Sequence, residues 1–371
     1  MKILIMNWRD IKNPRAGGAE VVIHENARAW VQAGHEVAVL TANFPGGSAL
    51  EIIDGVTIYR IGGVYSVYWK AVRFYKSQLQ GKYDIVLDAI NTIPFFTPLY
   101  VKEPVVSLIF QFTKEVYFSV FPKLIAVIPY LLEPLLFQVY KKHPVVVLSP
   151  SIRDELVGSG FALDKIHIVE PGIHLSSVHR RNIKAAKPLI VYLNRIISYK
   201  NPHHLLLALP KIQKIIPDTR VVITGFRANQ SYEKTVKKLI TQLHLEESVT
   251  TYGFIDGKKK AELLEDAWVH VLPSIREGWG ISVIEAAAYG TCSVGYDVVG
   301  LRDSIQHEKT GRLVAAGDID ALAEAIVTIL RDTSLRQTYD RNALAYASTF
   351  DWPVKARQFL AILQSYSAQP H

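Results

Sequence analysis

The sequence predicts an α/β protein with two doubly wound domains, each built around a parallel β-sheet. The chain opens with an apolar strand pattern at 2–6, a glycine-containing loop, a helical pattern at 19–33 and a second strand pattern at 36–41. This order is typical of a parallel sheet with right-handed crossovers. The alternation starts again near residue 189, and 371 residues with 49% apolar content can fill two cores.

Apolar segments of strand length recur in both halves of the chain. Further strands are predicted at 85–88, 105–109, 145–148, 189–193, 221–224, 249–252, 269–273 and 293–296. Helical patterns separate the later strands at 203–216, 231–243 and 258–266. We therefore expect an N-terminal domain at 1–170, a C-terminal domain at 171–350 and a terminal helix within 351–371. A ligand should bind between the domains, beyond the carboxyl ends of the strands.

Composition excludes several classes of protein. The net charge of +8 suits anionic ligands, but no zinc-finger spacing, basic helix or aromatic-and-basic RNA motif occurs, so nucleic acid is not an expected partner. The single cysteine, Cys292, excludes an internal disulfide framework and fits a reducing compartment. The apolar run at the N-terminus is too short for a signal peptide. We therefore expect a cytoplasmic protein.

The segment 116–140 is unusual because it carries only two charges, Lys123 and Glu133, among many large apolar residues. These charges and three prolines argue against a helix that crosses a membrane. Two interpretations remain: buried core helices, or a surface that dips into the bilayer without crossing it. In the second case the protein is peripheral on the cytoplasmic membrane face. The flanking cations that could meet anionic headgroups are Lys114, Lys141 and Lys142.

The most informative motif runs from Glu277 to Glu285, where two acids lie eight positions apart. Glu277 lies in a glycine-flanked loop, and Glu285 lies in the alanine-rich helical pattern that follows. A loop that leads into a helix directs free backbone N–H groups and the positive end of the helix dipole at a ligand, which suits a phosphate. The carboxylates can accept hydrogen bonds from sugar hydroxyls. The motif therefore predicts a nucleotide-sugar site.

Two cations, Arg195 and Lys200, follow the predicted strand 189–193, at the strand end where such folds bind ligands. Fixed cations there can neutralise a diphosphate leaving group. Taken alone, either residue could be an ordinary surface charge. Their position before Asn201-Pro202 and their match to the acidic loop favour a role in binding.

The pair Gly17-Gly18 follows the first strand and precedes a helix. Its backbone can approach an anionic ligand closely, although a plain tight turn explains the pair equally well. It lacks the spacing of a dinucleotide fingerprint, and no acid stands at the end of the second strand to bind a ribose. A dehydrogenase is therefore disfavoured.

Four stretches, spread over nearly the whole chain, together resemble the retaining GT-B glycosyltransferases of family 4. In chain order they are Gly17-Gly18-Ala19-Glu20, Arg195 with Lys200-Asn201-Pro202, Tyr252-Gly253-Phe254, and Leu272-Pro273-Ser274 through Glu277 to Glu285. The resemblance implies the GT-B fold, in which two Rossmann-like domains face each other across a cleft. It also implies that the terminal helix crosses back to the N-terminal domain; a helix that only caps the second domain is the alternative.

The resemblance implies a role for each matched residue. Arg195 and Lys200 would hold the diphosphate and Glu277 would bind hydroxyls of the transferred sugar, so these three are the expected catalytic residues. Glu285 would bind the ribose. The other donor-binding positions would act at the phosphates, the base or the acceptor: Gly17, Gly18, Gly253, Phe254, Gly280, Ile281 and Ser282. No metal and no cofactor are expected, since cations and the helix end neutralise the departing phosphate.

One position departs from the family pattern. A histidine usually follows the strand that corresponds to 105–109, and an ungapped placement puts Phe110 there. Phenylalanine cannot donate a hydrogen bond or carry a proton, so either Gln111 supplies a donor or the sugar pocket is altered. The histidines at 24 and 35 are expected to be ordinary packing or surface residues.

The sequence thus predicts a retaining, metal-independent glycosyltransferase that uses a nucleotide-diphosphate sugar, with UDP or GDP as the nucleotide. Its hydroxyl acceptor would be a lipid-linked or envelope glycan if 116–140 meets a bilayer. Two alternatives stay open. Phe110 allows a pseudo-transferase that binds nucleotide-sugar without turnover, and the architecture is shared by sugar-nucleotide epimerases, which would need acid and base carboxylates in the cleft.

Overall fold

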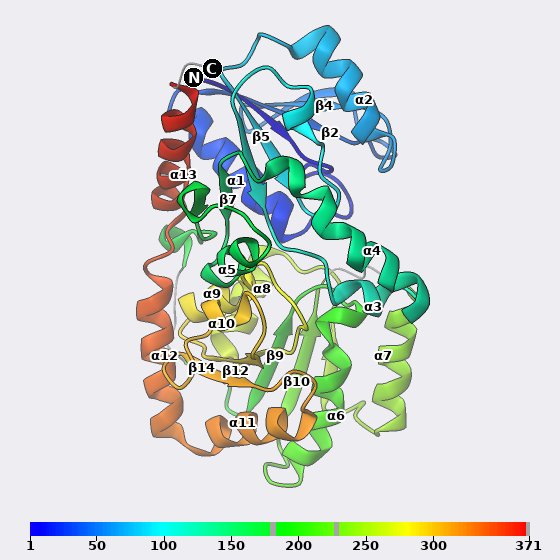
Figure 1. Ribbon diagram of the computed structural model, residues 1–371. Coiled ribbons are helices and arrows are strands. Elements are labelled where there is room, and N and C mark those ends of the chain that lie inside the picture. Colours follow the sequence, from blue (N-terminus) through cyan, green and yellow to red (C-terminus); the bar gives the residue numbers. More distant parts are fainter. Residues whose placement is uncertain (179–182, 226–229, 369–371) are drawn as a thin grey trace. The chain divides into compact units, whose positions relative to one another are not determined.

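The computed structural model describes residues 1–178, 183–225 and 230–368, and the chain forms two compact units. The first unit comprises Met1–Lys114, Val127–Gly172 and Asp351–His371. The second comprises Glu115–Ala126 and Ile173–Phe350. Figure 1 shows the helices and strands of the chain, many of them labelled.

The sheet of the first unit has the strand order β3-β4-β2-β1-β5-β6-β7-β8 among the described residues. Neighbouring strands are parallel except for the antiparallel pair β3–β4. The strands are β1 (Lys2–Met6), β2 (Glu36–Thr41), β3 (Leu50–Ile53), β4 (Val56–Arg60), β5 (Ile85–Ile90), β6 (Val105–Ile109), β7 (Val145–Val147) and β8 (Ile166–Ile168).

Alternate residues of each strand point to opposite sides of this sheet. Both sides are apolar, so helices cover both faces. Leu4 and Met6 of β1 share a buried cluster with Val67 and Ala71 of helix α2, while Ile3 between them points the other way. The helices are α1 (Gly18–Gln32), α2 (Val67–Phe74), α4 (Lys123–Leu136), of which the part from Val127 onward belongs to this unit, α5 (Pro150–Gly158) and α13 (Trp352–Ser367). The shorter helical turns are η1 (Tyr75–Leu79), η2 (Thr97–Leu99), η3 (Gln138–Tyr140) and η4 (Leu163–Lys165).

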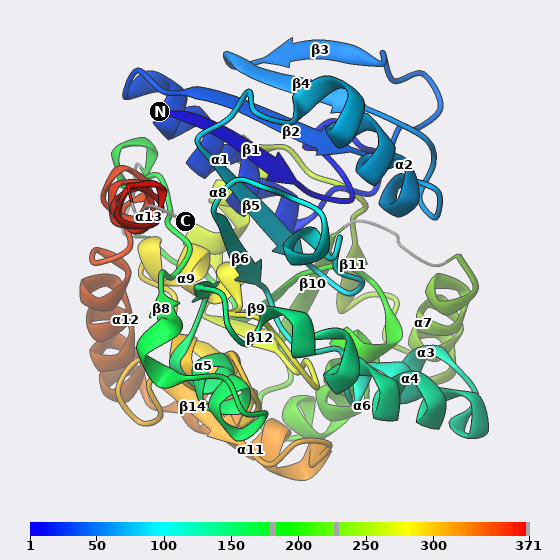
Figure 2. The same ribbon diagram turned by 45° about the horizontal axis from the view of Figure 1, so that its top comes forward.

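The hairpin β3–β4 forms the edge of the first sheet, beside β2 (Figure 2). Its turn residues Asp54 and Gly55 both have positive φ, 49° and 83°. Two consecutive residues with positive φ characterise the tight turn that matches the twist of a two-stranded ribbon. The sequence patterns above do not predict this hairpin, although the dipeptide Asp-Gly is its usual signal.

The terminal helix α13 packs against α1 within the first unit. The indole Nε1 of Trp30, which is 1% exposed, donates to the carbonyl oxygen of Ala356 at 2.9 Å. Its ring meets Phe359 edge to face, with centroids 5.3 Å apart. Lys355 adds an ion pair with Glu170 at 2.9 Å. The end of the chain is therefore part of the core of the first unit.

The sheet of the second unit has the order β11-β10-β9-β12-β13-β14, and its paired strands are parallel. The strands are β9 (Leu189–Leu193), β10 (Arg220–Thr224), β11 (Val249–Thr251), β12 (Val269–Leu272), β13 (Ser293–Tyr296) and β14 (Gly311–Val314). The helices are α3 (Val116–Val120), α6 (Pro202–Gln213), α7 (Gln230–Gln242), α8 (Gly257–Asp266), α9 (Ile281–Ala288), α10 (Leu301–Ser304), α11 (Ile319–Arg331) and α12 (Thr333–Ala347), with turns η5 (Leu175–Ser177) and η6 (Ser198–Lys200).

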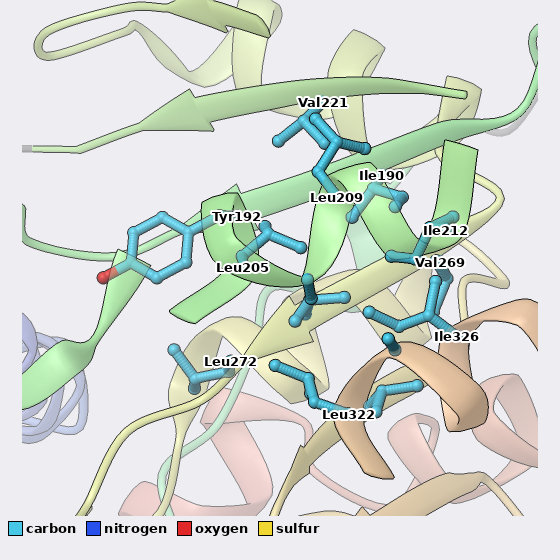
Figure 3. Close-up of a cluster of buried hydrophobic side chains, with 14 of the residues drawn as sticks. Ile190, Tyr192, Leu205, Leu209, Ile212, Val221, Val269, Leu272, Leu322 and Ile326 are labelled. Carbon is cyan, nitrogen blue, oxygen red and sulfur yellow. The ribbon is translucent and has the colours of Figure 1, made fainter. Parts of the chain in front are cut away.

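Two layers of helices enclose the second sheet. Ile190 of β9 shares the buried cluster of Figure 3 with Leu205 and Leu209 of α6 and with Ile326 of α11. Val191, the next residue along β9, belongs to a separate buried cluster with residues of α8 and α9. The helices α8 and α9 therefore cover the face opposite to α6 and α11, which makes this unit doubly wound.

The predicted fold class is confirmed, since both units are α/β with parallel sheets. The predicted strands 2–6, 36–41, 105–109, 189–193 and 293–296 agree with the structure at both ends, and the others differ by one or two residues. Elements that the patterns do not predict include β3, β4, β8, β14, α2, α10, α11 and α12.

Candidate functional site

Lys200 and Glu277 form a buried ion pair in the second unit. The Nζ atom of Lys200 lies 2.6 Å from Oε2 of Glu277, and the side chains are 7% and 11% exposed. The other carboxylate oxygen accepts hydrogen bonds from Asn194 Nδ2 at 3.1 Å and from Ser274 Oγ at 2.7 Å. The fold thus brings together two predicted site residues, and partners on both oxygens fix the orientation of the carboxylate.

The loop that carries Arg195 and Lys200 is held from below by Tyr192. The ring of Tyr192 is buried, and its hydroxyl extends from one side of the cluster in Figure 3 to donate to the carbonyl oxygen of Arg195 at 3.0 Å. Asn201 ends the loop with φ of 50° and donates from Nδ2 to the carbonyl oxygen of Pro273 at 3.0 Å. These bonds tie the lysine loop to the glutamate loop.

Arg195 has a different environment from Lys200. It is half-buried, and its backbone N–H donates to the side-chain oxygen of Asn194 at 2.8 Å. Within residues 1–178, 183–225 and 230–368 its guanidinium has no ion-pair partner. The backbone of Arg195 is thus held in place while its guanidinium remains available. Such a guanidinium is suited to bind a phosphate through two parallel hydrogen bonds.

Helix α9 begins a few residues after Glu277, and its N-terminus has the character of an anion site. Gly280 has φ of 96°, and a Cβ there would lie 2.9 Å from Cδ2 of Leu301, so only glycine fits without strain. The backbone N–H groups of Ile281 and Ser282 belong to the first helical turn and have no acceptor within the helix. The buried Ser282 Oγ also has no hydrogen-bond partner among the described residues.

The Glu277 loop rests on residues Val299 and Gly300, which the sequence reasoning missed. The Glu277 N–H donates to the carbonyl oxygen of Val299 at 3.2 Å. A Cβ on Gly300, whose φ is 82°, would lie 2.3 Å from the carbonyl oxygen of Glu277. Gly300 therefore permits the close backbone approach that fixes Glu277. An isolated glycine between Val299 and Leu301 gives no signal of this in the sequence.

Glu285, the second acid of the motif, pairs with Lys260. The Nζ–Oε1 distance is 2.6 Å, and the side chains are 36% and 25% exposed. The neighbouring Glu285 carboxylate raises the pKa of Lys260. Lys260 is not among the predicted site residues, because a lysine in the run 258–260 at the start of a helix is usually a solvated charge.

Gly253 and Phe254 follow β11, in the second unit. The carbonyl oxygen of Gly253 accepts from Thr224 Oγ1 at 3.1 Å and from the N–H of Gly225 at 3.3 Å. These bonds join the turn after β11 to the end of β10. The side chain of Phe254 is 85% exposed.

Gly17 and Gly18 lie in the first unit, at the N-terminus of α1. Gly17 is extended, with φ of −147° and ψ of −156°, so its conformation does not itself require glycine. Its N–H donates to Oε2 of Glu20 at 2.7 Å, which gives Glu20 a capping role. The predicted role of Gly17 and Gly18 in ligand binding therefore requires that a ligand approach their backbone closely.

The position of the expected histidine is apolar in the structure as well. Phe110 is 6% exposed and follows β6, where its N–H donates to the carbonyl oxygen of Ile90 at 3.2 Å. Phe112 is buried against Phe137, with ring centroids 4.9 Å apart. The Oε1 atom of Gln111 is buried and has no hydrogen-bond partner within the described part of the chain. Gln111 is thus the polar side chain at this strand end.

The other two histidines that were considered have structural partners. The Nε2 atom of His24 lies 2.8 Å from Oδ2 of Asp54. The Nδ1 atom of His35 lies 3.1 Å from the N-terminal amine of Met1. Both therefore act as the packing or surface histidines that the sequence predicts.

Helix α4 is anchored on one side and apolar on its exposed side. Glu133 is 1% exposed, and its oxygens accept from the N–H groups of Thr113 at 2.6 Å and Lys114 at 2.9 Å. The interpretation of this segment as buried core is wrong, because its outer face lies at the surface. Exposed fractions there reach 89% at Leu124 and 64% at Leu131.

By length and composition, 123–140 is the one stretch of the described chain that could cross a membrane. The anchoring of Glu133 to the backbone of 113–114 ties this helix to the fold and favours a surface position instead. Of the predicted flanking cations, Lys114 is paired with Glu155 at 3.1 Å, Lys141 is half-buried and Lys142 is exposed.

Comparison with known proteins gives consistent matches over the chain. Residues 16–177 match the family model described as Glycosyltransferase Family 4, and residues 177–345 match that described as Glycosyl transferases group 1. The chain is 25% identical over 374 residues to phosphatidyl-myo-inositol mannosyltransferase of Mycolicibacterium smegmatis, which covers 95% of this chain and 91% of that protein.

Two solved structures have the same fold. Sucrose-phosphate synthase of Thermosynechococcus elongatus has a TM-score of 0.83 at 20% identity and covers 98% of both chains. The HepE protein of Anabaena, in complex with UDP and glucose, has a TM-score of 0.79 at 20% identity and covers 98% of this chain and 100% of its own. These similarities confirm the predicted GT-B fold with two Rossmann-like domains.

Proposed function

Since the chain belongs to the glycosyltransferases of family 4, we propose that it moves a sugar from a nucleotide diphosphate to a hydroxyl acceptor with retention at the anomeric carbon. The observation that carries this proposal is the oriented Lys200–Glu277 pair, beside the free head of Arg195 and the N-terminus of α9. Cations, free amides and a fixed carboxylate are the groups that a sugar diphosphate needs.

Each group has a defined task in this proposal. Arg195 and Lys200 bind the diphosphate, and the backbone N–H groups of Ile281 and Ser282 donate to its distal oxygens. Glu277 accepts hydrogen bonds from hydroxyls of the transferred sugar. Its other partners, Asn194 and Ser274, keep it in place when Lys200 turns to phosphate.

The nucleoside is bound in the second unit as well. Glu285 accepts from the ribose hydroxyls, and its ion pair with Lys260 holds the carboxylate in place. The backbone at Gly253 and Phe254 meets the base. A UDP-sugar is the first donor to test, because the solved HepE complex contains UDP and glucose.

The proposed reaction proceeds on one face of the sugar. The acceptor oxygen bonds to the anomeric carbon on the side from which the phosphate leaves, and the bond between that carbon and the phosphate oxygen breaks. The electron pair stays on the phosphate, which takes the acceptor proton. Arg195 and Lys200 stabilise the negative charge that grows on the phosphate, which is the task that a divalent metal performs in other transferases.

The acceptor is proposed to be lipid-linked, with the protein peripheral on the cytoplasmic membrane face. The exposed side of α4 is apolar over its whole length, and exposed Lys123 and Lys142 stand at its ends. An apolar helix face with flanking cations matches an anionic bilayer, into which such faces bury to a depth of about 5–10 Å.

Helix α2 adds aromatic and cationic side chains on the same face of the first sheet. Trp69 of α2 and Tyr65, which precedes the helix, are 52% and 88% exposed, and the Lys70 and Arg73 cations lie 5.6 and 5.4 Å from the centre of the Trp69 ring. Exposed tryptophan and tyrosine favour the level of the lipid headgroups.

Contacts of strand β5 show which face of the first sheet α2 and the turn after α4 cover. Val86 packs in the buried cluster of α2, whereas Asp88, two residues on and therefore on the same face, accepts from the Tyr140 hydroxyl at 2.6 Å. Tyr140 lies in η3, directly after α4. Helix α2 and the turn that follows α4 therefore lie on the same face of this sheet.

Vesicle sedimentation tests the membrane contact. We expect wild type to sediment with vesicles that contain phosphatidylglycerol, and Leu124→Ser/Leu131→Ser to lose most of this binding. Leu163→Ser is the matched control, since Leu163 is 59% exposed and lies outside this face. Equal sedimentation of the three proteins would refute the contact.

Donor consumption tests the catalytic proposal. Purified protein is incubated with UDP-, GDP- and ADP-sugars, with and without membrane lipid, for wild type, Lys200→Ala and the control Lys187→Ala. Lys187 also forms a lysine–carboxylate pair in the second unit, with Asp218, but at the surface. We expect one donor to be consumed by wild type and the control, and Lys200→Ala to fall by about 10²- to 10³-fold.

The buried Phe110 favours a second candidate, a pseudo-transferase that binds nucleotide-sugar without turnover. Binding of one donor without its consumption, lipid included, would establish it. An epimerase is distinguished in the same assay, because it changes the sugar while the bond to the diphosphate stays intact.

A further inference from the structure

The segment Glu115–Ala126 lies in sequence between strands β6 and β7 of the first unit but packs into the second unit. Helix α3 within it contacts η6, the turn that carries Lys200. Ser198 Oγ of that turn donates to the carbonyl oxygen of Ser119 at 3.0 Å. A piece of chain from the N-terminal half is therefore built into the surroundings of the proposed donor site.

A second link connects the same segment to the other loop of the site. The Nη1 atom of Arg276 donates to Oε2 of Glu115 at 2.8 Å. Arg276 directly precedes Glu277, and the N–H of Ile275 donates to the carbonyl oxygen of Tyr199 at 3.0 Å. The segment thus contacts both loops of the site, the one that carries Lys200 and the one that carries Glu277. These two loops are also hydrogen-bonded to each other.

The burial of the two partners is unequal, and this decides what each can do. The Arg276 side chain is 3% exposed, whereas that of Glu115 is 54% exposed. A buried guanidinium requires nearby anionic or polar partners, so its position responds to the carboxylate that faces it. Glu115, in contrast, can lose its charge with little change in packing.

We propose that Glu115 is a positioning residue for the donor site. Through Arg276 it sets the place of the Glu277 loop, and through α3 it holds the turn of Lys200, so that a segment from the N-terminal half completes the donor site. This inference rests on the proposed function, because it assigns the task of donor binding to Lys200 and Glu277. It adds a residue that touches neither the sugar nor the diphosphate.

The expected effect follows from the geometry. A misplacement of about 1 Å in a positioning group can lower turnover by up to about 10²-fold. Loss of one charge partner loosens the loop without removing the other bonds of Glu277, so we expect Glu115→Gln to reduce kcat/KM for the donor by about tenfold. Glu115→Asp keeps a carboxylate, so its kcat/KM should lie between those of Glu115→Gln and wild type.

The matched control is Glu308→Gln. Glu308 also pairs with an arginine in the second unit, at 3.5 Å from Arg312, and its side chain is 61% exposed. Neither partner of this pair lies next to a residue of the site. The control therefore reports what the loss of an ordinary glutamate–arginine pair does to the protein.

The experiment combines donor kinetics with amide hydrogen exchange on wild type, Glu115→Gln, Glu115→Asp and Glu308→Gln. Support requires a tenfold loss in kcat/KM for Glu115→Gln, partial rescue in Glu115→Asp, and faster exchange confined to peptides that cover 198–201 and 274–280. If the kinetics and exchange of Glu115→Gln equal those of Glu308→Gln, the role of Glu115 is refuted and the proposed function is not affected. A wild type that binds none of the donors would overturn the proposed function, and the inference with it.

Discussion

Replacement of Lys200 by alanine should separate stability from function. The pair of Lys200 with Glu277 spans 2.6 Å, which at an effective dielectric constant of about 20 corresponds to about 6 kcal/mol of Coulomb attraction. Desolvation of two nearly buried charges offsets much of this. Removal of one partner of such a pair typically destabilises a protein by about 3–5 kcal/mol, because the other charge is left uncompensated.

We take about 3 kcal/mol for Lys200→Ala, since Asn194 and Ser274 still donate to the carboxylate. For a domain of this size that loss lowers the unfolding midpoint of the second unit by roughly 6–12 °C. The double variant Lys200→Ala/Glu277→Gln should recover most of the midpoint, because it leaves no buried charge. It should not recover donor consumption, since two of the side chains that bind the donor are lost.

Thermal unfolding followed by circular dichroism, together with the donor assay, measures both effects. The reasoning is refuted if Lys200→Ala unfolds at the wild-type midpoint, because the pair would then contribute nothing to the fold. It is also refuted if the double variant consumes donor at the wild-type rate, because the pair would then have only a structural role.

Three further predictions concern acid, metal and the terminal helix. His270 is fully buried and its pKa is lowered to about 3 by burial, so the unfolded chain binds a proton below about pH 6.5 and stability falls as pH drops from there towards 3. Denaturant unfolding should therefore show a loss between pH 7 and 5 that is about 2 kcal/mol larger in wild type than in His270→Gln; equal losses would contradict this. Excess EDTA should leave donor consumption unchanged, and a loss that magnesium or manganese restores would show that a metal takes part. Trp30→Phe removes the hydrogen bond to Ala356 and should lower the free energy of unfolding by about 1–2 kcal/mol, whereas Trp69→Phe, at an exposed site, should not; a similar loss in both would argue against the contact.

The strands were predictable because parallel strands with both faces covered appear as uninterrupted apolar runs. The segment 105–109 is buried at every position, and its bounds agree with the prediction. Strand β14 was missed because 311–314 contains an arginine and is only half-buried beyond its first residue. Elements at a sheet edge carry a weaker apolar pattern, which is why β3 and β14 escape a search for such runs.

The candidate site was predictable only as a set of residue types. Resemblance singled out Lys200 and Glu277, but their direct contact depends on loops that Tyr192, Asn201 and Gly300 hold in place. None of these supporting contacts follows a periodicity that sequence reasoning can detect. The same holds for Lys260, whose partner Glu285 lies on another helix.

The surroundings of Phe110 bear on whether turnover is possible without the histidine that usually occupies this position. Its side chain is buried, so a histidine there would need a partner inside the fold rather than solvent. The neighbouring Gln111 carries the unpartnered polar atom, Oε1, which is an acceptor, and its amide nitrogen is a donor. A donor of this kind can orient a sugar hydroxyl or carbonyl oxygen but cannot carry a proton. In the proposed reaction the acceptor proton moves to the leaving phosphate, so the loss of a titratable group at this position removes orientation rather than chemistry, and turnover remains compatible with Phe110.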